Sequence, residues 1–435
     1  MLIEANRRDS GLIRSVGTRS LAASIICIVV GAGIFAVPGA LAASIGPYAP
    51  IAILICAISI GSVAICFAEA GSRIACSGGV YGCIQAAFGP LTGYVAGTLL
   101  WIGNVLACGG ISAALADVAT SLLPQPLKAS VHAFVIVGAI GAIAFVNVGG
   151  VTRGMRLVRL ATVLKLAPLV LFVVVGAWAV HGRNYLPTET LGTAGLGRAL
   201  ILALFAFTGM EGSLCASGEV ADPARSIPRA LALALGSVTL LYVTIQAVAQ
   251  GILGPSLAQS TVPLADAMAR ISPALRLLML AGAAVSMFGW LSGDILGSPR
   301  MLFAFARDGW LPNRLGRLHG RTNAPHVSII CYSAIAIGLA LTGTFAELAV
   351  LATLTSAVLY ILGCGAAWLL SRRGVAEAGV PLNFRWLFAA MVVGIGSMLA
   401  LITLASQEEI IGLLVLISVC VAIYLLQARL VALRA

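Results

Sequence analysis

Long apolar stretches, separated by short polar connections, run through almost the whole chain of 435 residues. A helix that spans a bilayer needs about 20 mostly apolar residues. Twelve stretches fit this requirement, and their connections leave no room for a soluble domain. The pattern predicts an all-α polytopic membrane protein with twelve transmembrane helices, at 20–44, 50–71, 88–118, 130–149, 158–181, 197–217, 229–252, 275–303, 326–343, 346–370, 384–405 and 410–428.

Glycines interrupt the first and the sixth of these segments near their middle. The first segment contains Gly31 and Gly33, and the sixth contains Gly209 and Gly212. Backbone groups freed at membrane depth must be satisfied by protein, water or ligand. Paired interruptions in two halves of a chain point to a transporter site between inverted repeats. Close packing of helices through small residues is the alternative explanation.

An interrupted helix can bind a ligand without using side chains. Free N–H groups at the start of a half-helix attract an anion such as a carboxylate. Free carbonyl groups at the end of a half-helix attract a cation such as an ammonium group. A site that used both kinds of helix end would suit a zwitterionic amino acid, which is our hypothesis for the ligand.

The composition narrows the class of protein further. Hydrophobic residues make up 60% of the chain and charged residues only 9%, whereas soluble domains usually carry about 25% charged residues. This balance excludes a soluble enzyme, a disordered chain and an ordinary nucleic-acid binder. The net charge of +11 fits an excess of arginine on the cytoplasmic side of a membrane.

The positions of the basic residues predict the orientation. With a cytoplasmic N-terminus, only five of the 26 Lys and Arg residues fall outside, namely Lys128, Arg183, Arg198, Arg270 and Arg276. If a span were counted wrongly, the basic residues would no longer collect on one side of the membrane. We therefore expect a multi-pass protein of the bacterial inner (plasma) membrane with both termini in the cytoplasm.

Motifs around the interruptions resemble those of a known family. The first segment reads Gly31-Ala32-Gly33-Ile34-Phe35 and then Pro38-Gly39-Ala40, and the sixth reads Phe207-Thr208-Gly209-Met210-Glu211. Further motifs are Gly218-Glu219-Val220, Asp222-Pro223, Ile227-Pro228-Arg229-Ala230, Ser298-Pro299-Arg300 and Leu311-Pro312, with Ser77-Gly78-Gly79 before the third span. In this order they resemble the amino acid–polyamine–organocation (APC) transporters, among them bacterial amino acid permeases and arginine/agmatine-type exchangers.

The resemblance implies a LeuT-like architecture. Residues 1–19 would form a cytoplasmic tail, 20–181 a first repeat of five helices, and 197–370 a second, inverted repeat. Residues 384–428 would add two peripheral helices. Helices one and six would be broken, and the substrate would bind between the breaks while the bundle alternates its access.

The resemblance also implies which residues bind the substrate. Its carboxylate would meet the N–H groups around Gly31, Ala32 and Gly33. Its ammonium group would meet carbonyls near Ile28 and along the unwound stretch Phe205, Ala206 and Phe207. Phe205 matches an aromatic residue that closes over the substrate in the exchangers, although an ordinary core aromatic is the alternative.

Four polar residues at membrane depth are further functional candidates. Lys165 resembles a lysine that replaces a sodium ion in sodium-independent members; snorkelling to the inner face is the alternative. Glu211 matches a carboxylate suspected of proton sensing, or else it ties the helix break together. Asp294 could pair with a cationic substrate side chain or with Lys165, or simply contact a neighbouring helix. Asn104 matches an asparagine that contacts the substrate side chain, although asparagine also joins packed helices.

Enzyme chemistry is not expected. The four histidines lie at span ends or in loops, and neither a P-loop nor a GxSxG motif occurs, so we predict no catalytic residues, no metal site and no cofactor.

The sequence predicts a sodium-independent secondary transporter of amino acids that is coupled to protons or works by exchange. A cationic amino acid/amine antiporter and a sensor that does not transport are the alternatives. Partners are the substrate, the bilayer, protons and a second copy in a homodimer, but not nucleic acid.

Overall fold

The computed structural model describes residues 17–31, 33–74, 79–121, 123–149, 165–186, 193–214, 220–307, 310–320, 322 and 324–432. Several residues named above lie outside this part of the chain. They are Ala32, the motif residues 77–78 and 218–219, the first part of the predicted fifth span, and most of the predicted cytoplasmic tail.

The described residues form helices that are joined by short connections. The α-helices are α2 (Thr18–Val29), α3 (Gly33–Ile45), α4 (Ala49–Arg73), α5 (Gly79–Phe88), α6 (Pro90–Thr120), α7 (Gln125–Val148), α9 (Thr193–Phe207), α10 (Met210–Leu214), α11 (Pro223–Leu253), α12 (Pro263–Ala269), α13 (Pro273–Gly297), α14 (Pro299–Arg307), α15 (His326–Thr342), α16 (Phe345–Arg372), α17 (Leu387–Thr403) and α18 (Gln407–Ala432). An apolar helical stretch covers Lys165–Ala179. Short 3-10 helices are η1 (Gly46–Tyr48), η2 (Ala177–Ala179), η3 (Gly182–Tyr185) and η5 (Gly254–Gln259).

The apolar helices agree with the prediction of a polytopic membrane protein. In the described part of the chain, eight helical stretches are long and apolar enough to cross a membrane, by length and composition. They include Pro90–Thr120, Pro223–Gln259 and Phe345–Arg372. Shorter apolar helices of 10–17 residues add to these, for example His326–Thr342 and Leu387–Thr403.

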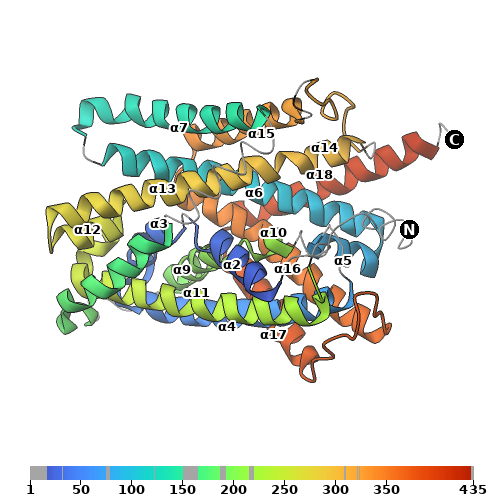
Figure 1. Cartoon of the computed structure of the whole chain (residues 1–435), viewed down its shortest axis with the longest axis horizontal. Helices are drawn as coiled ribbons and strands as arrows, with labels where there is room; N and C mark the ends of the chain where they lie inside the picture. The colour runs from blue at the N-terminus through green and yellow to red at the C-terminus, as the bar shows by residue number, and fades with distance from the viewer. Residues whose placement is uncertain are drawn as a thin grey trace.

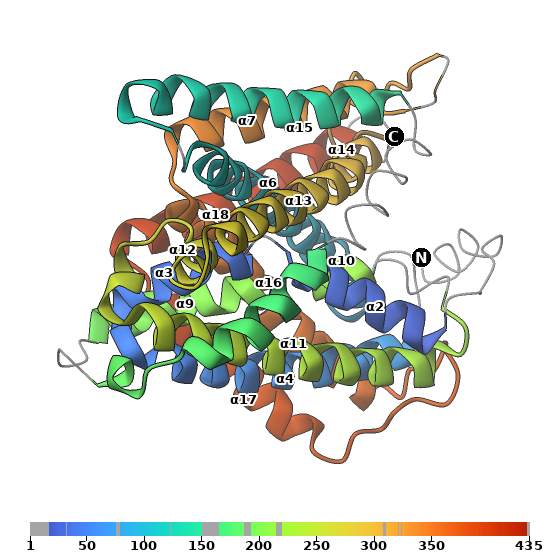
Figure 2. The same cartoon turned by 60° about the vertical axis from the view of Figure 1, so that its left-hand side comes forward.

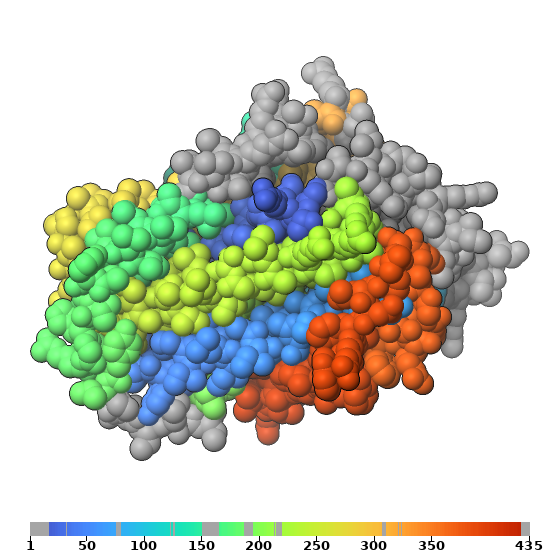
Figure 3. Space-filling model, turned by 60° about the horizontal axis from the view of Figure 1, so that its bottom comes forward, coloured from blue at the N-terminus to red at the C-terminus, as the bar shows by residue number. Residues whose placement is uncertain are grey.

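The helices stack in layers around a common core. Helices α6 and α13 cross the middle of the bundle, with α7 and α15 on one side and α4, α11 and α17 on the other (Figures 1 and 2). Figure 3 shows α11, α4 and α17 lying side by side on one face. These helices expose large apolar side chains, including Ile58, Leu240 and Phe388. Such a surface suits contact with lipid rather than water.

The first and sixth predicted spans are interrupted where the glycines indicated. Helix α2 ends at Val29 and α3 begins at Gly33. Helix α9 ends at Phe207, and the short α10 begins at Met210 after the turn formed by Thr208 and Gly209.

Many hydroxyl groups within the helices are satisfied inside their own helix. Ser112 donates to the carbonyl of Cys108 at 2.7 Å, and Thr353 donates to that of Ala349 at 2.7 Å. This bond to the preceding turn lets a polar side chain lie in an apolar bundle without a partner on another helix.

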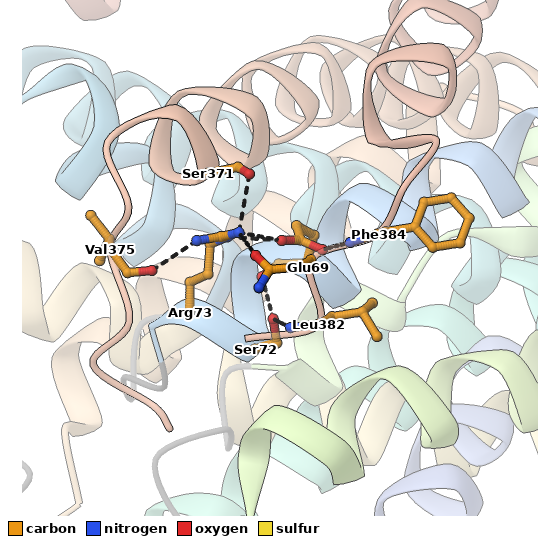
Figure 4. A network of polar contacts seen from close by, with 8 residues as sticks. Glu69, Ser72, Arg73, Ser371, Val375, Leu382 and Phe384 are labelled. Atoms are coloured by element: carbon orange, nitrogen blue, oxygen red, sulfur yellow. Dashed lines mark hydrogen bonds and ion pairs between the residues drawn. The ribbon is translucent and has the colours of Figure 1, made fainter. Parts of the chain in front are cut away.

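A buried ion pair ties the end of α4 to the connection between α16 and α17 (Figure 4). Glu69 and Arg73 lie one helical turn apart, and their charged atoms approach to 2.7 Å. Arg73 also donates to Ser371 Oγ at 3.0 Å, to the Val375 carbonyl at 3.0 Å and to Asn383 Oδ1 at 2.6 Å. Because nearly every polar atom finds a partner, this pair can be buried without leaving a charge uncompensated.

Backbone N–H groups of the connection between α16 and α17 also bond to side chains of α4. The N–H of Phe384 donates to Glu69 Oε2 at 2.9 Å, and the N–H of Leu382 donates to Ser72 Oγ at 3.0 Å. Ser72 in turn donates to the Glu69 carbonyl at 2.8 Å. The α16–α17 connection is therefore fixed to α4 by both side chains and backbone.

We expect Arg73→Met to lower the stability of the protein strongly. The change removes the partner of the fully buried Glu69, and breaking a buried pair in this way costs about 3–5 kcal/mol. Thermal unfolding in detergent provides the measurement. Arg225→Met is the control, because Arg225 and Asp222 form a largely exposed pair at 3.9 Å that contributes little. Equal unfolding midpoints for the two variants would contradict this assignment.

Candidate functional site

The two helix interruptions lie against each other. Gly209 has a φ of +115°, a conformation that glycine adopts without strain, and a Cβ there would lie 2.9 Å from Ile28 Cγ2. A Cβ on Gly33 would lie 3.5 Å from Ala206 Cα. The glycines therefore allow the backbone of one break to approach that of the other.

Side chains from three other helices satisfy carbonyl groups at the first break. The ammonium group of Lys165 donates to the carbonyl of Cys27. Tyr242 OH donates to that of Val29 at 2.8 Å, and Ser286 Oγ donates to that of Gly31 at 3.3 Å. The carbonyl of Ile28 lies between these bonded positions. These contacts explain how the chain leaves helical geometry at this depth.

A cavity lies between the breaks and the helices α6, α13 and α16. Its wall combines backbone from both breaks with apolar side chains and a few polar groups. The lining residues are Ile28, Val29, Gly31, Gly33, Gly103, Asn104, Ala107, Ile111, Phe205, Ala206, Thr208, Gly209, Glu211, Trp290, Ala352 and Ser356.

Most of the predicted substrate-binding residues lie on this wall, and two do not. The lining includes Ile28, Gly31, Gly33, Asn104, Phe205 and Ala206, together with Glu211. Phe207 and Asp294 lie behind it, and Ala32 is outside the described residues.

The two phenylalanines of α9 point in different directions. Phe205 faces the cavity, and its ring packs edge-on against Phe345 with a centroid separation of 5.7 Å. Phe207 is fully buried against Tyr242, with ring centroids 5.3 Å apart. Positions two residues apart lie on opposite sides of a helix, so only one of the pair can face a ligand.

Glu211 is bonded to the second break and to α16. Its carboxylate accepts the N–H of Gly209, with Oε2 at 3.1 Å, and the hydroxyl of Tyr360 at 2.9 Å. The side chain is 4% exposed. Among the described residues that line the cavity, Glu211 is the only one with an ionisable side chain.

Asp294 takes part in a chain of hydrogen bonds behind the cavity wall. Its Oδ1 accepts from Ser298 Oγ at 2.6 Å, and its Oδ2 accepts from Tyr332 OH at 2.5 Å. Ser298 Oγ also accepts from Asn104 Nδ2 at 3.0 Å. Within the described part of the chain, no hydrogen bond or ion pair joins Asp294 to Lys165.

Sequence reasoning missed Trp290 on α13. A Cβ on Gly31 would lie 2.6 Å from Trp290 Cδ1, so the indole covers the first break directly. Trp290 precedes Asp294 by four residues and shares its helix face, which was the available signal. Thr208 and Ser356 were also missed; they bond to carbonyls of their own segments, Phe205 at 2.7 Å and Ala352 at 3.1 Å.

Comparison with known proteins assigns the chain to a family. The family model for amino acid permeases matches residues 16–426. The chain belongs to the amino acid permease family. An uncharacterized transporter of Mycobacterium tuberculosis is 32% identical over 368 residues, which cover 77% of this chain and 75% of that protein.

Two relatives from Bacillus subtilis carry more specific names. The branched-chain amino acid permease BcaP is 25% identical over 98% of this chain and 96% of its own length. The serine/threonine exchanger SteT is 27% identical over 86% of this chain and 88% of its own length. These matches confirm the resemblance to APC transporters, and they agree with the prediction that the chain is not an enzyme.

We expect Gly31→Ala to impair amino acid uptake. The new methyl group would lie within 2.6 Å of Trp290, and overpacking of this kind costs about 1–3 kcal/mol. Uptake per amount of folded protein in proteoliposomes provides the measurement. Gly61→Ala is the control, since nothing lies within 4 Å of its added methyl group in α4. Wild-type uptake by Gly31→Ala would exclude a close-packed site at this glycine.

Proposed function

We propose that this permease is a secondary active transporter of small neutral amino acids, independent of sodium and driven by protons or by exchange. The cavity between the two helix interruptions carries this proposal. The N-terminus of α3 at Gly33 would receive the substrate carboxylate, whereas the N–H of Gly31 already donates to the Val29 carbonyl at 2.7 Å. The carbonyl of Ile28 and the end of α9 at Phe205 and Ala206 would receive the ammonium group.

The charge of the cavity wall favours a neutral side chain. Glu211 already accepts hydrogen bonds from Gly209 and Tyr360, and Asp294 lies behind the wall. These bonds already stabilise the Glu211 carboxylate, so it attracts a cationic side chain less than an anion without donors would. The names of BcaP and SteT refer to branched-chain amino acids and to serine and threonine, which are also neutral.

We further propose the LeuT-like arrangement for this chain. Twelve spans would form two inverted repeats, 20–181 and 197–370, with peripheral helices at 384–428 and both termini in the cytoplasm of a bacterial cell. The positions of the breaks, after Val29 in the first half and after Phe207 in the second, support this arrangement.

The position of Lys165 supports independence from sodium. Its ammonium group bonds to the Cys27 carbonyl beside the first break, and the side chain is 4% exposed. A fixed positive charge at this place supplies what a bound cation would supply to the helix end. Glu211 would then respond to protons or tie the break together.

Uptake into proteoliposomes tests the proposed function. We expect labelled alanine, serine, threonine or valine to enter, with no change in rate when sodium is replaced by choline. A proton gradient or internal amino acid should accelerate entry. Uptake restricted to cationic amino acids and their amines would establish the antiporter alternative. Binding of amino acids without uptake would establish the sensor alternative.

We expect Lys165→Met to reduce uptake by about tenfold or more. The variant keeps the length of the side chain but removes a hydrogen bond from a charged donor, which contributes roughly 1.5–3 kcal/mol. Initial rates with and without sodium provide the measurement. Lys128→Met on α7, away from the cavity, is the matched control. Undiminished uptake by Lys165→Met would remove this lysine from the mechanism.

A further inference from the structure

Asn104, a polar residue of the cavity wall, ends a chain of hydrogen bonds that begins at residues outside the cavity. Asn104 on α6 is the lining residue, whereas Ser298 and Asp294 belong to α13 and its C-terminal cap. Asp294 and Ser298 lie four residues apart, so their side chains lie on one helix face. Ser298 is 4% exposed and Tyr332 is fully buried.

The direction of each bond follows from the number of hydrogens available. Both oxygens of Asp294 act as acceptors, one for Ser298 and one for Tyr332. A serine hydroxyl has a single hydrogen, so Ser298 can only accept from its other neighbour. That neighbour is the side-chain amide of Asn104, which must therefore present its NH₂ group to Ser298, at 3.0 Å.

The other half of the Asn104 side-chain amide is its carbonyl oxygen. With Nδ2 bonded to Ser298, the carbonyl oxygen of Asn104 is the half of the amide left to accept a hydrogen bond from elsewhere. Asn104 lines the cavity, and among the described residues this oxygen accepts no hydrogen bond. The cavity wall thus offers a preorganised acceptor.

We propose that Asp294 is a positioning residue: through Ser298 it holds Asn104 with its carbonyl oxygen toward the cavity, so that the site prefers substrates whose side chain carries a hydrogen-bond donor, such as a hydroxyl group. Asp294 then acts without touching the substrate. This assignment rests on the proposed function, because it deepens the specificity of the same cavity.

Pairs of amino acids with equal shape test the donor preference. Threonine and valine differ by a hydroxyl in place of a methyl group. O-methyl-L-threonine and isoleucine also share a shape, but neither carries a side-chain donor. We expect threonine to be favoured over valine by about three- to tenfold in KM and in Kd, the size of one neutral hydrogen bond. The second pair should show no preference.

Three substitutions test the chain of positioning bonds. Asn104→Leu should abolish the preference for threonine over valine, and Ser298→Ala and Asp294→Asn should reduce it. In Ser298→Ala, whose altered side chain lies outside the cavity wall, the KM for alanine should change little. A merely structural role would impair all three amino acids alike. Thr120→Val is the matched control, since Thr120 lies on α6 and its hydroxyl bonds to the Ala116 and Asp117 carbonyls of the same helix. If Asp294→Asn does not fold, Ser298→Ala decides.

The outcomes separate this inference from the proposed function. A wild-type protein that does not distinguish threonine from valine overturns the inference, as does a preference for O-methyl-L-threonine over isoleucine. An unchanged preference in Ser298→Ala also overturns it. If alanine is bound but not transported, the proposed transport fails, while the ratio of Kd values still tests the inference by thermal stabilisation of the protein.

Discussion

Backbone groups that leave helical geometry inside an apolar bundle must find partners, and the centre of this protein is arranged around that requirement. The first break is supported by Lys165, Tyr242 and Ser286, which come from three different segments of the chain. The second is closed by its own Thr208 and by Glu211. Because the supports of the first break are side chains on separate helices, this break keeps its shape only while these helices stay in place. The cavity between them is a consequence of this support.

The sequence revealed the places of the breaks but not the contacts across them. Glycines in apolar segments are visible in a linear pattern, and the helix ends at Val29 and Phe207 follow that pattern. Which of Phe205 and Phe207 faces the cavity depends on the rotation of α9, which its neighbours determine. Trp290 was missed because an aromatic residue is common in an apolar helix, and only its place one turn before Asp294 set it apart. Asp294 was recognised as unusual, but its distance from the wall depends on how α13 packs against α6 and α15.

The ion pair of Glu69 and Arg73 plays a different part from the polar groups at the centre. Its partners are Ser371 at the end of α16 and residues of the connection between α16 and α17. This pair is buried at the end of α4 and its charged atoms are almost completely hydrogen-bonded, whereas at membrane depth only a few charged groups are tolerated. This explains why charge is used to fasten a connection here, while the cavity is built largely of backbone and neutral side chains.

The hydroxyl groups that bond within their own helix have a mechanical consequence. Ser112 and Thr353 contribute polar atoms to α6 and α16 without joining the two helices. A neighbouring helix can slide past such a surface without breaking a hydrogen bond, so displacement meets little resistance from polar groups. Resistance is concentrated instead at the bonds that do cross between helices, such as Tyr360 to Glu211 and Asn104 to Ser298. The bundle therefore contains helix surfaces that can slide past each other. It also contains positions where a hydrogen bond between two helices makes them move together.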